Sequence, residues 1–215
     1  IFDQTLWGLA NGGVLFSTVV GDYLFAHHSF FLFYPLAAIY EAVPSVELLL
    51  VLQSVVLGLG ALPLYWLAKD KLGRGLAATV AILYLLYPAL NYINLEDFHI
   101  ETFAVTAVLF SLYFIERRKH LLFFLMVGVT ALIKEDAALT AAAIGLYAVL
   151  KRRLRIGMAA IIIAAAIFLI ATKLFIPYFS QAGSFETGGF GKLGNTPADI
   201  VRSLVTNPLG IAAVL

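Results

Sequence analysis

Long runs of apolar residues that are almost free of charge limit most strongly how this chain folds. Six such runs lie at Leu48–Ala68, Leu76–Ile93, Phe103–Ile115, Leu121–Ile133, Ala137–Leu150 and Ile156–Ala171. About 20 apolar residues cross the hydrocarbon core of a bilayer, which is roughly 30 Å thick. Several runs reach that length with their flanks, and 62 % of the 215 residues are hydrophobic. The pattern predicts an all-α, polytopic transmembrane helical bundle.

The charged residues are concentrated in short connections between these runs. The connections 69–74, 116–120 and 151–155 hold ten of the fourteen basic residues, but only Asp70 and Glu116 among the thirteen acids. Basic connections stay in the cytoplasm by the positive-inside rule. The other eleven acids are therefore expected on the opposite, exofacial side of the membrane.

The same rule predicts that residues 121–150 form two helices. A single helix would place the basic connections at its two ends on opposite sides of the bilayer. The two helices are shorter than a normal span, so Lys134, Glu135 and Asp136 between them are expected to lie below the exofacial surface and line a cavity. The alternative is an internal ion pair that lets a short hairpin turn.

The chain divides into three parts. Residues 1–45 are predicted to be an exofacial loop with interfacial helices, because Asn11-Gly12-Gly13 signals a turn and the aromatic run Phe30–Tyr40 suits the headgroup boundary. Residues 46–176 are predicted to hold about six membrane helices, two of them short. Residues 177–215 are expected to be an exofacial loop with a short helix capped by Thr196 or Asp199, and then the start of a further helix at Leu209–Leu215. The start at Ile1 and the apolar end suggest an internal portion of a longer protein.

Polar residues that carry chemistry collect on the predicted exofacial side and form an acidic cavity. The candidate cavity residues are His27, His28, Glu96, Glu101, Glu135 and Asp136, joined by Asp3, Asp22, Asp97, His99 and Lys134. Carboxylates with imidazoles bind a divalent metal ion or transfer protons, and a lysine can hold a phosphate.

Spacing within this set allows finer predictions. Glu96 and His99 are three residues apart, so on a helix they would share a face and form a metal site. His27 and His28 are adjacent, so on a helix they point about 100° apart and would not hold one ion together. The alternatives are a solvated loop for residues 96–101 and plain interfacial histidines.

Other functional classes are disfavoured by composition. The net charge is +1, and no basic stripe with interleaved aromatic residues is present, so a nucleic-acid partner is not expected. The chain has no cysteine, which excludes disulfides and thiol chemistry.

Several motifs resemble one family. They are Phe2-Asp3-Gln4, the aromatic run from His28 to Tyr40, Tyr84-Leu85-Leu86-Tyr87-Pro88, Asp97-Phe98-His99 and Lys134-Glu135-Asp136. Together they resemble a family of predicted multi-pass membrane proteins of bacteria and archaea. That family is similar to the GT-C glycosyltransferases, which include the protein O-mannosyltransferases and the aminoarabinose transferases. The resemblance implies a GT-C-like bundle in the plasma (inner) membrane of a prokaryote.

The resemblance also implies roles for individual residues. Asp3 matches the catalytic base, and Asp97 and His99 are the other candidate catalytic residues. Lys134 matches a lysine that contacts the phosphate of a polyprenyl-linked sugar donor. Glu96 would line the donor or metal pocket beside Asp97 and His99. The implied function is transfer of a sugar from a polyprenyl-phosphate donor to an exofacial acceptor, with the lipid bilayer and the donor as partners.

Two alternatives remain open. The chain is either an enzyme, or a non-catalytic accessory subunit of a larger membrane protein complex that keeps the fold, or a lipid transporter that uses the same cavity without breaking a bond. A bound isoprenoid lipid would favour the enzyme or the transporter. Other membrane subunits in fixed stoichiometry would favour the accessory subunit.

Overall fold

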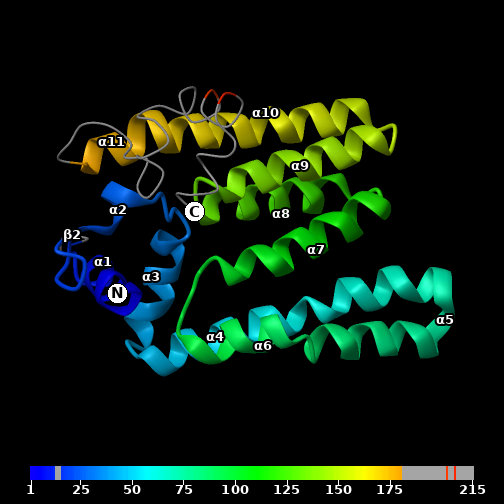
Figure 1. Cartoon of the computed structure of the whole chain (residues 1–215), viewed down its shortest axis with the longest axis horizontal. Coiled ribbons are helices and arrows are strands. Elements are labelled where there is room, and N and C mark those ends of the chain that lie inside the picture. The colour runs from blue at the N-terminus through cyan, green and yellow to red at the C-terminus, as the bar shows by residue number, and fades with distance from the viewer. Residues whose placement is uncertain (13–15, 181–201, 203–205, 207–215) are drawn as a thin grey trace.

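The computed structural model describes residues 1–12, 16–180, 202 and 206, and their regular structure is almost entirely helical (Figure 1). The bundle consists of α4 (Val46–Leu59), α5 (Ala61–Leu85), α7 (Thr102–Glu116), α8 (His120–Ile133), α9 (Ala137–Leu150) and α10 (Leu154–Ile170). Each of α7 to α10 packs against its neighbours, and α4 and α5 pack against α7. The tail helices predicted near Thr196, Asp199 and Leu209–Leu215 lie outside the described residues.

The first long apolar segment, Val46–Leu85, contains two antiparallel arms. Gly60 has helical backbone angles, so α4 continues directly into α5. Gly73 has φ 78° and ψ 172°, a non-helical conformation that glycine adopts without the steric cost of a Cβ atom. Figure 1 shows the chain turning back within α5 and returning toward α6 (Pro88–Glu96). The predicted break at residues 69–74 is thus confirmed.

The charged connections lie at the two opposite ends of this bundle. Residues 69–74, 117–119 and 151–153 form what we call the basic end, whereas residues 97–101 and 134–136 lie with α1 to α3 at the acidic end (Figure 1). Two ion pairs join elements at the basic end, between Arg117 and Asp70 at 2.5 Å and between Lys151 and Glu116 at 2.9 Å. The structure therefore confirms that the three basic connections share one end.

Helix length and apolar composition together identify two candidate membrane spans among the described residues. They are Val46–Leu85 and Leu154–Phe179, the latter running from α10 through a π-helical turn, η1 (Ala171–Phe175), into α11 (Ile176–Phe179). The helices α8 and α9 have 14 residues each. At 1.5 Å per residue each is about 21 Å long, against the roughly 30 Å of a bilayer core. A helical membrane protein is supported, and α8 and α9 are separate and short as predicted.

Residues 1–45 contain a small sheet that the all-α prediction missed. Between α1 (Phe2–Ala10) and α2 (Leu24–His27) lies an antiparallel hairpin of β1 (Phe16–Ser17) and β2 (Asp22–Tyr23), with Phe16 opposite Tyr23. Gly21 permits its turn with φ 76°, and the Phe16 and Tyr23 rings meet edge to face at 5.7 Å. The prediction was wrong here because a ring contact and one glycine turn stabilise a hairpin too short to give an alternating pattern. The part closes with α3 (Phe33–Ala42).

Two glycines bring α9 and α10 into close contact. A Cβ atom on Gly157 would lie 2.5 Å from the Gly145 carbonyl oxygen and 2.7 Å from the Val149 amide nitrogen. A Cβ atom on Gly145 would in turn lie 2.9 Å from the Gly157 carbonyl oxygen. Small residues at helix interfaces allow this approach inside membranes, where van der Waals packing dominates association.

We therefore expect Gly157→Ala to destabilise the protein by about 1–3 kcal/mol, because the new methyl group overlaps backbone atoms of α9 that have no freedom to move. Gly128→Ala is the matched control, since a Cβ atom there meets nothing within 4 Å. The control should be neutral or stabilising by up to about 1 kcal/mol through helix propensity. Unfolding in detergent measures the stability of both variants. Equal changes in stability for Gly157→Ala and Gly128→Ala would contradict the close packing of α9 and α10.

Candidate functional site

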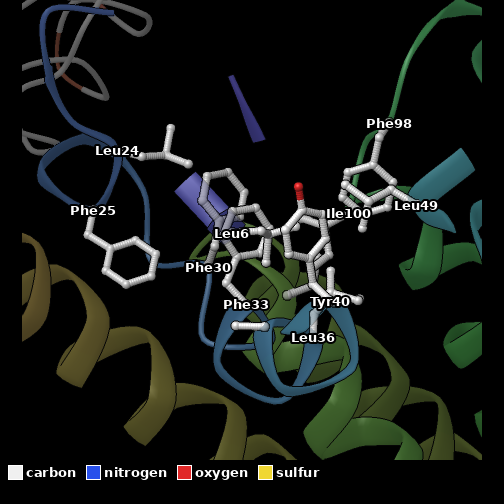
Figure 2. Close-up of a cluster of buried hydrophobic side chains, with 12 residues drawn as sticks. Leu6, Leu24, Phe25, Phe30, Phe33, Leu36, Tyr40, Leu49, Phe98 and Ile100 are labelled. Atoms are coloured by element: carbon white, nitrogen blue, oxygen red, sulfur yellow. The ribbon is translucent and has the colours of Figure 1, made fainter. Parts of the chain in front are cut away.

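A buried cluster of apolar side chains supports the acidic end of the bundle (Figure 2). It joins α1, α2, α3 and α4 to the segment before α7 and to the end of α8, through the following members: Leu6, Leu24, Phe25, Phe30, Phe33, Leu36, Ala37, Tyr40, Leu49, Phe98, Ile100 and Ile133. We call it the acidic-end cluster. Several members are sequence neighbours of candidate site residues, such as Phe98 beside His99 and Ile133 beside Lys134. The cluster therefore anchors the backbone from which the polar side chains project.

The segment with Asp97 and His99 is held in an extended form by Gln53 of α4. Gln53 is fully buried, its amide nitrogen donates to the Asp97 carbonyl at 3.0 Å, and its amide oxygen accepts from the His99 backbone N–H at 2.7 Å. The Thr102 hydroxyl donates to the His99 carbonyl at 2.7 Å, which fixes the start of α7. One buried side chain thus satisfies two backbone groups of a segment without regular structure.

His99 and Asp97 form a pair as a consequence. His99 Nδ1 lies 2.7 Å from Asp97 Oδ1, and no described residue makes a hydrogen bond to His99 Nε2. The Asp97 side chain is 71 % exposed and that of His99 is 32 % exposed, so both are reachable from outside. A carboxylate that binds one ring nitrogen of a histidine orients the ring and leaves the other nitrogen for proton transfer.

The predicted helical face shared by Glu96 and His99 was wrong. The helix α6 ends at Glu96, and Asp97 is extended, with φ −153° and ψ −173°. The hydrogen bonds from Gln53 compete successfully with continuation of the helix. Glu96 is exposed, and the carboxylate beside His99 is that of Asp97 instead.

Asp3 accepts a hydrogen bond from Tyr40. The Tyr40 hydroxyl donates to Asp3 Oδ1 at 2.6 Å and, as Figure 2 shows, points out of the acidic-end cluster. Burial of Tyr40, followed by its hydrogen bond to Asp3, raises the pKa of the phenol to about 12. Tyr40 is therefore protonated at neutral pH and remains a donor to Asp3.

The two adjacent histidines have different partners. His27 Nε2 lies 3.1 Å from Asp22 Oδ2 beside the hairpin. His28 Nδ1 lies 2.8 Å from Glu135 Oε1, and the Ser29 backbone N–H donates to Glu135 Oε2 at 3.0 Å. His27 and His28 therefore pair with carboxylates from two different parts of the chain.

Glu135 is buried, and its charge is compensated by these contacts. Burial raises the pKa of this carboxyl, but the hydrogen bonds from His28 and from backbone N–H groups outweigh burial, so its pKa lies below the ordinary 4.5. Its backbone lies in the connection between α8 and α9. Glu135 thus ties this connection to the first part of the chain as an ionised group.

Lys134 is positioned beside two carboxylates without a hydrogen bond to either. Its Nζ atom lies 3.6 Å from Glu101 Oε1 and 3.8 Å from Asp136 Oδ2, and its side chain is only 18 % exposed. Both distances exceed the range of an ordinary N–H···O hydrogen bond. Glu101 Oε2 is buried and has no hydrogen-bond partner among the described residues. The Lys134 ammonium donors and the Glu101 Oε2 acceptor therefore have no hydrogen-bond partner among the described residues.

Phe2 connects the separate polar pairs. Its ring packs edge to face on Phe30 at 5.5 Å, on Phe98 at 6.1 Å and on the His99 ring at 5.9 Å. Asp3 follows it directly, and His28 packs on Phe30 at 5.5 Å. The structure thus arranges Asp3, His28 and His99 around one aromatic centre at the acidic end.

The polar side chains of this site do not form one compact cluster. Within the part of the chain that the structure describes, no group of three His, Asp or Glu side chains is placed to hold a metal ion. The arrangement instead consists of separate pairs, each of which orients one polar group.

Gln53, Tyr40 and Ser29 are the site residues that the sequence analysis did not select. Gln53 carried a usable signal, since it is a lone amide inside an apolar run and such groups are rarely left without a partner. Tyr40 stands in an aromatic run that suits packing equally well, and Ser29 acts through its backbone, so neither carries a local signal.

The chain was compared with known proteins. Residues 1–215 match a family model described as predicted membrane protein (DUF2079). No curated protein and no solved structure matches the chain. The match agrees with the two long apolar helices in indicating a membrane protein.

The ionised state of Glu135 leads to a pH-dependent stability. Because its pKa is lower in the folded than in the unfolded chain, its contribution is present above about pH 4.5 and is lost as the pH falls through the folded-state pKa. Glu135→Gln should cost about 1.5–3 kcal/mol at neutral pH and flatten the acid dependence. Asp136→Asn is the matched control, because that side chain is 67 % exposed. Circular dichroism during unfolding at neutral and acidic pH measures the stability of each protein. If the stability of wild type and of Glu135→Gln depends on pH in the same way, the prediction is wrong.

Proposed function

We propose that this chain, which belongs to the DUF2079 family of predicted membrane proteins, transfers a sugar from a polyprenyl-phosphate donor to an acceptor at its acidic end. The proposed architecture is a GT-C-like bundle that crosses the membrane several times, with the acidic end exofacial and the basic connections in the cytoplasm of a prokaryotic cell. The positive-inside rule and the position of all three basic connections at one end support this orientation.

The loosely paired Lys134 is the observation that carries the proposal. Its side chain is 18 % exposed, and its Nζ atom stands between Glu101 and Asp136 at ion-pair distances of 3.6 and 3.8 Å, beyond the range of a hydrogen bond. The ammonium donors are therefore free to bind a ligand with strong acceptor oxygens. A phosphate group has this chemistry, and the nearby carboxylates suit the hydroxyl groups of a sugar.

The location of Lys134 favours a donor carried by a lipid. It directly follows α8, whose residues before it include the buried Ile133 and many apolar neighbours. An isoprenoid chain would lie along such apolar helices while its phosphate reached the charged end. In the transfer step Lys134 would stabilise the negative charge of the departing polyprenyl phosphate.

His99 is the best oriented group to take the proton from the acceptor hydroxyl. The acceptor hydroxyl oxygen would attack the anomeric carbon of the sugar, the bond from that carbon to the phosphate oxygen would break, and the hydroxyl proton would pass to His99 Nε2. Asp97 would hold the ring and stabilise the resulting imidazolium. Asp3, the base implied by the resemblance, already accepts a hydrogen bond from Tyr40 at 2.6 Å, which occupies one of its carboxylate oxygens.

Lys134→Ala should weaken binding of farnesyl phosphate, a short polyprenyl phosphate, by about tenfold or more, because a charge-assisted hydrogen bond to the phosphate is lost. Lys173→Ala is the matched control, since Lys173 is an exposed lysine in η1. Calorimetric titration measures the affinity, with farnesol as the ligand without phosphate. Equal binding of farnesol, or an unchanged affinity in Lys134→Ala, would refute the phosphate role.

His99→Asn should lower the release of polyprenyl phosphate from a polyprenyl-phosphate hexose by about 10²–10⁴-fold while leaving farnesyl phosphate binding intact. Glu96→Gln is its control, because Glu96 is exposed. Asp3→Asn decides between the two bases. If Asp3→Asn abolishes release and His99→Asn does not, Asp3 is the base. If release by the wild type is absent although farnesyl phosphate binds, the protein carries the lipid without transfer.

A further inference from the structure

A hollow at the basic end lies far from the site described above. Its volume is about 650 Å³, and it is lined by residues of the α7–α8 and α9–α10 connections, namely Arg118, His120, Lys151, Arg152, Arg153, Leu154, Arg155 and Ile156. Five of these eight residues are arginine or lysine, and none is acidic. Figure 1 shows the two connections at the end of the bundle opposite to α1 and α2.

Most of this positive charge is not neutralised. The two acids of the basic end are already paired, Asp70 with Arg117 and Glu116 with Lys151. No carboxylate of the described residues forms an ion pair with Arg118, Arg152 or Arg155. The hollow therefore carries a net positive charge that attracts an anion.

Arg153 gives a second, independent indication of a ligand. Its Nη1 atom is buried and has no hydrogen-bond partner among the described residues. A buried guanidinium nitrogen without an acceptor is unfavourable, and a phosphate oxygen is the acceptor that fits guanidinium geometry best.

Two helices also begin at this hollow without a side-chain cap. Lys119 precedes α8 and Arg153 precedes α10, and neither side chain caps its helix. Lysine and arginine have no acceptor atom, so the N–H groups of the first turns have no side-chain acceptor at the cap. Helix N-termini in this state favour an anion through their N–H groups and their dipole.

Two arginines at the hollow adopt a left-handed backbone conformation that glycine would adopt with less strain. Arg118 and Arg152 have φ 56° and 59°. Each stands just after a helix, and the next residue donates a backbone hydrogen bond back into that helix. Lys119 N–H donates to the Phe114 carbonyl, and Arg153 N–H donates to the Ala148 carbonyl. This helix end normally has glycine at the left-handed position. The chain instead carries a cation at both positions, on the rim of the hollow.

Exposed leucines beside the hollow favour a lipid as the source of the phosphate. Leu121, Leu150 and Leu154 next to the two connections are 83 %, 73 % and 61 % exposed. Exposed leucines directly beside clustered arginines suit the boundary between acyl chains and lipid headgroups. A free phosphate would use the arginines but leave these leucines uncovered.

We propose that the hollow at the basic end binds the phosphate of an anionic phospholipid, with its acyl chains against Leu121, Leu150 and Leu154. The Arg153 guanidinium and the first N–H groups of α8 and α10 hold the phosphate, and Arg118 and Arg152 add charge at the rim. This site is separate from Lys134 and does not depend on the sugar-transfer proposal.

Native mass spectrometry of the purified chain with equal amounts of phosphatidylglycerol and phosphatidylcholine of the same acyl chains tests the proposal. The wild type should retain phosphatidylglycerol preferentially. Arg152→Gly removes a charge while relieving the left-handed backbone, so it should fold and bind phosphatidylglycerol about fivefold more weakly. Arg153→Gln should weaken binding by at least as much. Arg74→Gln, an exposed basic residue of the 69–74 connection outside the hollow, is the matched control and should change little.

Three results would overturn the proposal. The first is equal retention of the two lipids by the wild type. The second is an equal loss in Arg74→Gln and Arg152→Gly, which would indicate a diffuse attraction of positive charge rather than a site. The third is displacement of phosphatidylglycerol by inorganic phosphate at similar concentration, which would indicate a site for a soluble anion. Lys134→Ala should leave phosphatidylglycerol retention unchanged, which separates this site from the proposed donor site.

Discussion

The cost of charge in hydrocarbon is the constraint on which the rest of this structure depends. An apolar chain of this kind has room for ionisable groups only where helices end or where partners enclose them. Its long apolar helices accordingly carry few charges in their middle turns, and most charged residues lie in connections, near helix ends or at the turn within α5. The consequence is two chemically different ends. One end pairs acids with histidines and a lysine over an apolar cluster, and the other end concentrates arginines around a hollow.

The acidic end shows how non-helical backbone is stabilised beside apolar helices. Residues 97–101 have no regular hydrogen bonding of their own, and the buried amide of Gln53 replaces it. The connection between α8 and α9 is held in the same manner by His28 and the Ser29 backbone through Glu135. Each connection is therefore fixed by a partner from a distant part of the chain. Side chains such as His99 and Lys134 gain defined positions without belonging to a helix.

Features that depend on local composition were predictable from the sequence, and features that depend on distant pairing were not. The grouping of Arg117, Lys151 and their neighbours predicted one basic end, and the same argument required the break at Lys134. The contact of Gln53 with His99 joins residues that are 46 positions apart, and that of His28 with Glu135 joins residues 107 apart. Neither hydropathy nor charge counts contain such contacts. The helical face expected for Glu96 and His99 failed for this reason, since a tertiary hydrogen bond outweighed local helix propensity.

The shortness of α8 and α9 has a consequence for how molecules reach Lys134. A hairpin of two 14-residue helices is about 9 Å shorter than an ordinary bilayer core. Either the bilayer thins around the hairpin or its tip lies beneath the level of the surrounding headgroups. In the first case the headgroups come down to the tip, and in the second the tip lies within the bilayer, so in neither case does the tip stand above the lipid surface. A polyprenyl donor of the kind proposed for Lys134 would then arrive by sideways diffusion within one leaflet, and its polar head would not have to be lifted into water to meet the ammonium group.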